Sequence, residues 1–334
     1  MTTLQSPLPA TRVARVHLLG AGPVGRAFLK RIEAHPELSL VALTDTQATV
    51  YARDGLDADA LRRWKAGGRS LAERRGAYAV DAALAADLVA ADVVVDATTT
   101  RPRYATDAWL RCRAALRGGG ALVLAAKDGL ARGAASLAAD AALARVGCNA
   151  VLGGTGARLL AERHTLANAR QVALVANGST TALIERVEAG ASPDEAIEAL
   201  RADGVLEADA AQDLDGTDAA LKLEVVAGLL WGIRPAIPRE AFHDLDPDLL
   251  RERAGRGLTT RLVARARRGG EAGVRYEAVP RGSPLAVPSG RVAYTYRLPR
   301  GHTRAHLGAG LGPDGTADAL LADVLAFATK GGAR

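Results

Sequence analysis

The first part of the chain alternates short, nearly continuous apolar runs with longer stretches of helical character. Apolar runs of this length are typical of strands buried on both faces of a parallel sheet. They occur at residues 13–19, 38–45, 90–100 and 118–126. Stretches that predict helices follow or separate them at residues 26–35, 59–75 and 109–116. This alternation predicts an α/β region in which helices cover a mostly parallel sheet.

The second part of the chain has a different pattern. It predicts a strand, a polar turn and a helix over 169–190, then a helix over 192–204 that begins with Ser-Pro-Asp-Glu. Residues 217–231 predict a further, nearly all-apolar helix. Alternating polarity then predicts a hairpin around Gly269 and Gly270 and a strand at 291–298, before a glycine-rich turn and a closing helix. We therefore expect an α+β arrangement here.

The first apolar run ends in the sequence GAGPVG, residues 20–25, which leads into a helix. Strand, glycine turn and helix form the context of a dinucleotide-binding fingerprint. Gly20 would permit the tight turn, Gly22 would let the backbone approach the pyrophosphate, and Gly25 would allow close packing of helix on strand. The helix N-terminus would attract the phosphate charge. We expect a Rossmann-type nucleotide site.

An acidic residue stands where such a site needs one. Asp45 ends the second apolar run, twenty residues after Gly25, and an acid at this distance can bind the adenosine ribose hydroxyls. Its carboxylate would repel a 2′-phosphate, which favours NAD and leaves NADP open. The alternative is that Asp45 only stabilises a turn.

Candidate catalytic groups lie in the apolar helix. Asp218, Lys222 and Glu224 are its only charged residues, and Asp218 and Lys222 share one helix face. A desolvated ammonium beside a carboxylate could polarise a carbonyl or pass a proton. The alternative is an ordinary surface ion pair, with Asp215 as the N-cap. Lys127, at the carboxyl edge of the predicted sheet, is either a solvated loop residue or a group facing the nicotinamide.

Bulk properties narrow the class of protein. A chain of 334 residues exceeds one ordinary domain and suits a two-domain enzyme. The net charge of +6 invites a nucleic-acid partner, but the arginines are dispersed and no nucleic-acid-binding motif accompanies them, so we expect none. No transmembrane run or signal peptide is evident, which predicts a cytoplasmic protein without membrane attachment. Cys112 and Cys148 lack the spacing of a zinc or disulfide framework.

The order of several motifs resembles that of the homoserine dehydrogenase family, which interconverts L-homoserine and L-aspartate 4-semialdehyde. The resemblance spans nearly the whole chain and rests on GAGPVG, YARDGLD, VDATTT, AAKDGLA, NGSTTALI, GVLEADAAQDLDGTDAALKL, VPRGSPLA and GAGLGPDGTADALLADVL. It implies a Rossmann-type parallel-sheet nucleotide domain over residues 1–135 and an α+β substrate-binding and dimerisation domain over 136–307. It also implies a turn and helix over 308–334 that return to the nucleotide domain, with no regulatory domain after them.

The resemblance assigns roles to individual residues. It implies that Lys127 and Lys222 serve hydride and proton transfer and that Asp218 works with Lys222. It places the substrate against Glu207, Asp213 and the turn formed by Gly178, Ser179 and Thr180. It places the cofactor, NAD or NADP, against Gly20, Gly22, Pro23, Val24, Gly25, Asp45, Thr98, Thr99 and Lys127. It further implies a homodimer formed through the sheet of the second domain.

Two departures from the family pattern affect the expected chemistry. Some relatives bind a monovalent cation where this chain has Asn149, Leu152 and Gly154, but Asn149 replaces the usual Glu, so the cation is left open. Thr181 and Ala182 replace the usual Asn-Tyr after the substrate turn. The main expectation is an NAD(P)-dependent homoserine dehydrogenase. A dehydrogenase of another small amino-alcohol is the alternative, and a non-catalytic NAD-binding sensor is a third, although a sensor would need no catalytic lysines.

Overall fold

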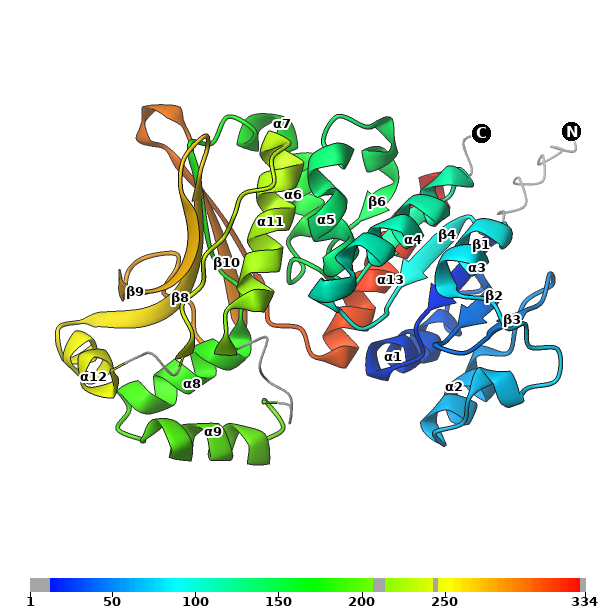
Figure 1. The fold of residues 1–334 in the computed structure, drawn as a ribbon, viewed down its shortest axis with the longest axis horizontal. Coiled ribbons are helices and arrows are strands. Elements are labelled where there is room, and N and C mark those ends of the chain that lie inside the picture. The colour runs from blue at the N-terminus through cyan, green and yellow to red at the C-terminus, as the bar shows by residue number, and fades with distance from the viewer. Residues whose placement is uncertain (1–12, 207–213, 243–245, 331–334) are drawn as a thin grey trace, which may run out of the picture.

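The computed structural model describes residues 13–206, 214–242 and 246–330, and these form two β-sheets with helices between and around them (Figure 1). The first sheet has the strand order β3-β2-β1-β4-β5-β6 and is parallel except at β3. Its strands are β1 (Ala14–Leu19), β2 (Leu38–Thr44), β3 (Thr49–Tyr51), β4 (Val93–Asp96), β5 (Ala121–Leu124) and β6 (Val146–Gly147). The predicted parallel α/β region is confirmed.

Helices cover this first sheet. They are α1 (Pro23–Ile32), α2 (Ala58–Ala66), α3 (Ala82–Leu88), α4 (Ala105–Arg117), α5 (Asp128–Leu137) and α13 (Pro313–Lys330), with 3₁₀ turns at Leu71–Glu73, Pro102–Tyr104 and Ala141–Arg145. The last helix, α13, comes from the far end of the chain and packs beside α1 (Figure 1). Its Ala317, Leu320 and Val324 are fully buried in the same cluster as Val16 and Phe28.

The second sheet is antiparallel, with the order β11-β10-β7-β8-β9. Its strands are β7 (Gln171–Val175), β8 (Leu258–Arg267), β9 (Ala272–Pro280), β10 (Arg291–Arg297) and β11 (Thr303–Ala309). The accompanying helices are α6 (Gly156–Ala161), α7 (Arg163–Leu166), α8 (Gly178–Glu188), α9 (Pro193–Ala202), α11 (Thr217–Trp231) and α12 (Pro247–Gly255), with a 3₁₀ turn at Pro299–Gly301. In Figure 1, α11 lies beside this sheet, and α8, α9 and α12 lie at its lower end.

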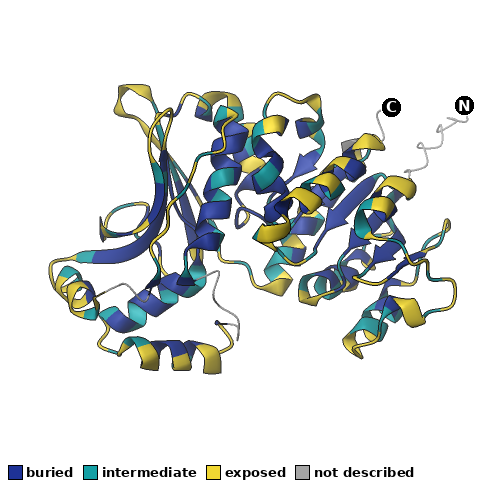
Figure 2. Cartoon of the chain, in the orientation of Figure 1, coloured by how far each residue is buried: buried dark blue, intermediate teal, exposed yellow. Residues whose placement is uncertain are grey.

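The two halves share one hydrophobic core through α11 and α5. The dark ribbon of α11 in Figure 2 reflects its burial, because most of its side chains are apolar. Gly228 of α11 lies so close to α5 that a Cβ there would stand 2.6 Å from the Cβ of Ala134. Because α11 packs apolar side chains against both halves, few of its positions can carry a charge. The charged side chains that it does carry lie where neighbouring groups can pair with them.

The structure differs from the sequence-based prediction at several elements, and short elements such as β3, α3, α5 and α12 were not predicted. Helix α1 begins at Pro23, inside the glycine motif, because proline suits the first helical position. Helix α2 ends at Ala66 rather than near residue 75, since Gly67 and Gly68 follow it. Strand β11 was not predicted, because its end runs into the glycine-rich turn; a Cβ at Gly308, the glycine within the strand, would lie 2.1 Å from the carbonyl oxygen of Gly153.

None of the helices in the described ranges is both long and apolar enough to cross a membrane. Cys112 and Cys148 are free and buried. Burial raises the pKa of both thiols far above the ordinary value, which keeps them protonated and unreactive.

Candidate active site

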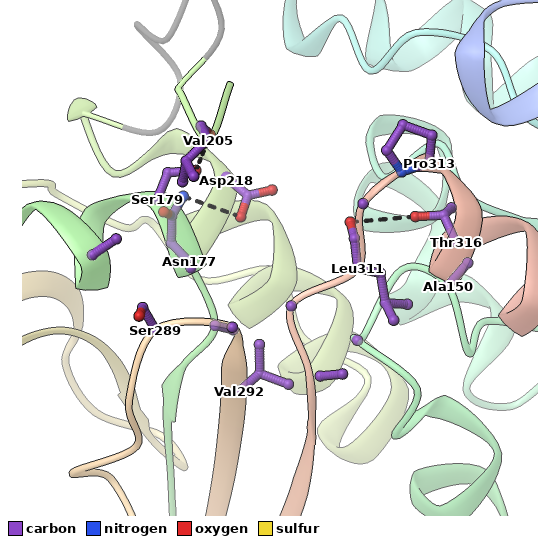
Figure 3. A pocket seen from close by; sticks show the side chains of 18 of the residues that line it. Ala150, Asn177, Ser179, Val205, Asp218, Ser289, Val292, Leu311, Pro313 and Thr316 are labelled. Carbon is purple, nitrogen blue, oxygen red and sulfur yellow. Dashed lines mark hydrogen bonds between the residues drawn. The ribbon is translucent and has the colours of Figure 1, made fainter. Parts of the chain in front are cut away.

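A cavity of about 1240 Å³ lies between the carboxyl edge of the parallel sheet and the second sheet. Figure 3 shows Asn177, Ser179 and Asp218 on one side of this cavity and Leu311, Pro313 and Thr316 on the other. The predicted site residues that line it are Val24, Thr98, Thr99, Lys127, Gly178, Ser179, Asp218 and Lys222. Residues that the sequence predicted to act together therefore meet at one place, although they come from five separate segments.

One wall of the cavity carries a carboxylate held between two lysines. Nζ of Lys222 lies 2.6 Å from Oδ2 of Asp218, and Nζ of Lys127 lies 3.2 Å from Oδ1 of the same residue. Lys222 also donates a hydrogen bond to the carbonyl oxygen of Ala176, at the end of β7. These two acceptors use two of the three N–H donors of the Lys222 ammonium.

This arrangement decides between the two interpretations of Asp218 and Lys222. Each side chain is only 12% exposed, and both line the cavity, so they are not an ordinary surface pair. Helix α11 begins after Gly216, whose φ of +73° places it in the left-handed region, and Asp215 accepts a hydrogen bond from the backbone nitrogen of Thr217. Asp215 therefore stabilises the turn before α11, and the Asp218 carboxylate pairs with the two lysines.

The lysines also fix the charge of Asp218. Burial alone would raise the pKa of the carboxyl, but the adjacent Lys222 and Lys127 ammonium groups outweigh it and lower that pKa to about 2. Asp218 is therefore ionised near neutral pH, where it pairs with both lysines.

Asn177 is a site residue that the sequence analysis did not single out. Its Nδ2 donates to Oδ2 of Asp218 at 3.4 Å. Its Oδ1 accepts from the backbone nitrogen of Thr180, and through this hydrogen bond Asn177 caps the N-terminus of α8. An Asn between a strand and a helix is an N-cap signal that could have identified it. The cap turns Gly178 and Ser179 toward the cavity, while Thr180 is buried below them. Glu207 and Asp213, the other predicted substrate ligands, lie outside the described residues.

The glycine turn has the shape that a dinucleotide requires. Gly20 has a φ of +94°, which a residue with a side chain rarely adopts. A Cβ at Gly25 would lie 2.1 Å from the carbonyl oxygen of Gly20, so helix α1 can pack on β1 only without one. Beside Gly22 there is open space, and Pro23 is the first residue of α1. The residues present thus fit a pyrophosphate at the α1 N-terminus.

Asp45 follows β2 as predicted, but its carboxylate already has four donors. Oδ1 accepts from the backbone nitrogens of Gln47 and Ala48, and Oδ2 accepts from the backbone nitrogen of Leu71 and from Nζ of Lys65 at 2.7 Å. Four donors match the lone-pair capacity of a carboxylate. This geometry matches the alternative role, that of a turn residue. A ribose contact would need the carboxylate to exchange one of these donors, so that contact stays a prediction.

The cofactor-side wall is a hydrogen-bonded edge after β4 and β5. Oδ1 of Asp96 accepts from the backbone nitrogen and the hydroxyl of Thr98, and Arg111 bonds both residues. The backbone nitrogen of Lys127 donates to the hydroxyl of Thr100, which ties the two loops together. These bonds hold Thr98, Thr99 and Lys127 at the edge where α/β sheets bind ligands.

The residues at the expected cation position do not fit a monovalent cation. Nδ2 of Asn149 donates to Asp323 on α13, and its Oδ1 accepts from the backbone nitrogen of Ala157. The carbonyl oxygen of Asn149 accepts from Leu152 and Gly154, and that of Leu152 accepts twice from Thr155. These oxygens already have protein donors. No group of three or more His, Cys, Asp or Glu suited to a metal occurs in the described parts of the chain.

Comparison with known proteins adds to this geometry. The family model for homoserine dehydrogenase matches residues 157–325, about half of the chain. The NAD(+)-dependent homoserine dehydrogenase of Pseudomonas canavaninivorans is 28% identical, covering 93% of this chain and 95% of its own. The homoserine dehydrogenase of Methanocaldococcus jannaschii is 24% identical, with 92% and 96% covered.

Solved structures show the same fold. A hyperthermophilic archaeal homoserine dehydrogenase in complex with NADPH superposes with a TM-score of 0.77 at 23% identity, covering 95% of this chain and 98% of that one. The enzyme of Thermoplasma acidophilum gives 0.74 at 20% identity, with 95% and 99% covered. The glycine turn, the lysine-flanked carboxylate and the extent of these matches lead to one assignment: the chain belongs to the homoserine dehydrogenase family.

Proposed function

We propose that the protein oxidises the alcohol of L-homoserine to L-aspartate 4-semialdehyde, or reduces the aldehyde, with NAD or NADP. The observation that carries this proposal is the Lys222 ammonium, which is shielded from bulk water, held by Asp218 and faces a cavity shared with the glycine-turn half of the protein. A member of this family with that group in place is a nicotinamide-dependent oxidoreductase acting on an alcohol.

The chain's own residues supply orientation and charge. When bound, the nicotinamide supplies or accepts the hydride, because the cofactor carries the redox chemistry. The remaining N–H donor of Lys222 would bind the reacting oxygen and stabilise the negative charge that develops on it. Lys127, which enters from the cofactor side of the cavity, would add a second positive charge, and Asp218 would keep both lysines in position.

The substrate would lie against the N-terminus of α8. Gly178 and Ser179 line the cavity there, and the first backbone N–H groups of a helix attract an anionic group such as an α-carboxylate. We propose Glu207 and Asp213 as partners of the substrate ammonium. Asp213→Ala should then raise the KM for L-homoserine with little change in the KM for the nucleotide.

The decisive experiment is oxidation of L-homoserine with each nicotinamide cofactor, followed by absorbance of the reduced form. The Lys222→Ala variant should lose about 100-fold or more in turnover, since a preorganised stabilising charge is removed. Lys30→Ala, an exposed lysine on α1, is the matched control and should keep full activity. Unchanged turnover in Lys222→Ala, at unchanged melting temperature, would refute the assignment.

We also propose a homodimer formed through the second sheet. Helix α11 packs on one face of this sheet, and on the opposite face Leu307 of β11 is 58% exposed. Ala305 and Thr295, opposite one another in the register of β10 and β11, share its face and are partly exposed. Sedimentation should give a dimer for the natural chain and a monomer for Leu307→Lys. A monomeric natural chain would contradict the proposal.

A further inference from the structure

The cavity does not end at the lysine-bound carboxylate but continues along helix α8. Ala182, Glu185, Arg186 and Ala189 line it, and their spacing places them on one face of the helix. At a rise of about 1.5 Å per residue this face extends about 10 Å from Ala182 to Ala189. A four-carbon amino acid, with C–C bonds of about 1.5 Å, spans only about 5 Å. The groove is therefore longer than L-homoserine needs.

The far part of this groove carries charges of both signs. Nη2 of Arg186 donates to Oδ2 of Asp203, and both side chains are accessible, with Arg186 40% exposed. Glu185 accepts from Arg261 at 2.9 Å and from the backbone nitrogen of Ser289. A guanidinium has five N–H donors, so Arg186 can bind a second carboxylate while it keeps Asp203.

We propose that this groove, defined by the α8 face, Asp203 and Ser289, binds the zwitterionic head of an ω-hydroxy amino acid longer than L-homoserine. The head's carboxylate meets Arg186, and its ammonium lies between Glu185 and Asp203. The aliphatic chain then passes Ala182, whose small side chain leaves room, and brings the terminal alcohol to Lys222. The reaction stays the same: a hydride passes from the alcohol carbon to the nicotinamide dinucleotide, the hydroxyl proton goes to water, and an aldehyde forms.

This inference rests on the proposed function and is tested by chain length. L-Homoserine and its homologues with five and six carbons are compared by kcat/KM under saturating NAD or NADP. We expect at least a tenfold higher kcat/KM for one of the longer alcohols, because added methylenes fill apolar space that L-homoserine leaves empty. The Ala182→Phe variant, which fills the groove, should reverse this preference.

The Arg186→Gln variant tests the head-group contact without refilling the cavity. It should lower kcat/KM for the longer alcohols about tenfold and that for L-homoserine less than threefold. Arg251→Gln is the matched control, because Arg251 also pairs with an exposed aspartate, Asp248, but lies on α12 and does not line the cavity. It should change neither value.

The outcomes separate the two proposals. If L-homoserine is the best substrate and Arg186→Gln affects all alcohols equally, the extended groove is refuted while the dehydrogenase assignment stands. If no alcohol of the series is oxidised with either cofactor, both proposals are refuted.

Discussion

Lys127 and Lys222 come from different halves of the fold and meet on opposite oxygens of one carboxylate. Lys127 stands at the start of α5, after the parallel sheet, and Lys222 lies one turn into α11. Their Nζ atoms are 3.2 Å and 2.6 Å from Asp218. Because α5 and α11 also pack tightly at Gly228 and Ala134, the spacing of the two ammonium groups is set by the core rather than by flexible side chains.

Replacing Asp218 by Asn should disturb both lysines at once. Without the carboxylate, the two ammonium groups lose their common acceptor and repel each other, so neither is held toward the reacting oxygen. We expect turnover to fall about 100-fold. Turnover measured across the pH range from 6 to 10 checks this. Glu224→Gln, on the same helix but paired with Arg234, is the control and should keep the natural profile.

The natural enzyme should show no acid limb from Asp218. Its pKa in the folded state, about 2, lies below the unfolded value of about 3.9. The lysine contacts therefore contribute stability that is present above pH 4 and is lost as the pH falls toward 2. Turnover should stay flat with respect to this group between pH 5 and pH 7. A loss of activity in that range that Asp218→Asn abolishes would contradict the prediction.

Asp323 should give stability the opposite pH dependence. Burial raises its pKa to about 6, although two hydrogen bonds from Asn149 oppose this shift. The folded state thus holds its proton more tightly than the unfolded state, and stability falls as the pH rises from about 4 to about 6. The slope is at most about 1.4 kcal/mol per pH unit.

Denaturation of the natural chain and of Asp323→Ala across this pH range should show the effect as a shrinking difference in unfolding free energy. Asp318→Ala, on the same helix, is the control. Arg31 lowers the pKa of Asp318, so the stability it contributes is already present above the unfolded value near 4 and its difference should stay nearly constant from pH 4 to pH 6. A constant difference for Asp323→Ala would show that this carboxyl does not titrate in the folded protein between pH 4 and 6.

Monovalent cations should not be required. The carbonyl oxygens of Asn149 and Leu152, and the side-chain oxygen of Asn149, already accept protein hydrogen bonds. Turnover in potassium, sodium and choline chloride at equal ionic strength should agree within about twofold, a spread that corresponds to about 0.4 kcal/mol. A rise of tenfold or more with one of the metal ions would mean that this turn rearranges around a cation.

Asp45→Ala should lower stability more than it changes cofactor preference. The substitution leaves the buried backbone nitrogen of Leu71 and the Lys65 ammonium without their acceptor, which costs about 1–3 kcal/mol of unfolding free energy. We expect the ratio of kcat/KM for NAD and NADP to change less than tenfold. A larger shift toward NADP at unchanged melting temperature would instead establish the predicted ribose contact.

The sequence predicted those features that depend on local chemistry. The glycine spacing predicted the turn before α1. The few charges of an apolar helix identified Asp218 and Lys222, because a buried charge must be paired with another group. It did not predict β11, where position 308 must be glycine because the carbonyl oxygen of Gly153 lies too close for a Cβ. Nor did it reveal that Lys65 and Leu71 occupy Asp45, because those contacts depend on how α2 and the following turn fold back onto β2.

Because α13 packs against α1, the core of the nucleotide half can be completed only after α13 has been synthesised. Arg31 of α1 pairs with Asp314 and Asp318 of α13, and the apolar side of α13 completes the core over β1. The nucleotide half extends to β6, which ends at Gly147, and α13 ends at Lys330, so at roughly 5–20 residues per second about 10 to 40 s of synthesis separate them. Until α13 packs there, the apolar surface over β1 is uncovered, so ribosome-bound intermediates of this chain should bind chaperones during that interval.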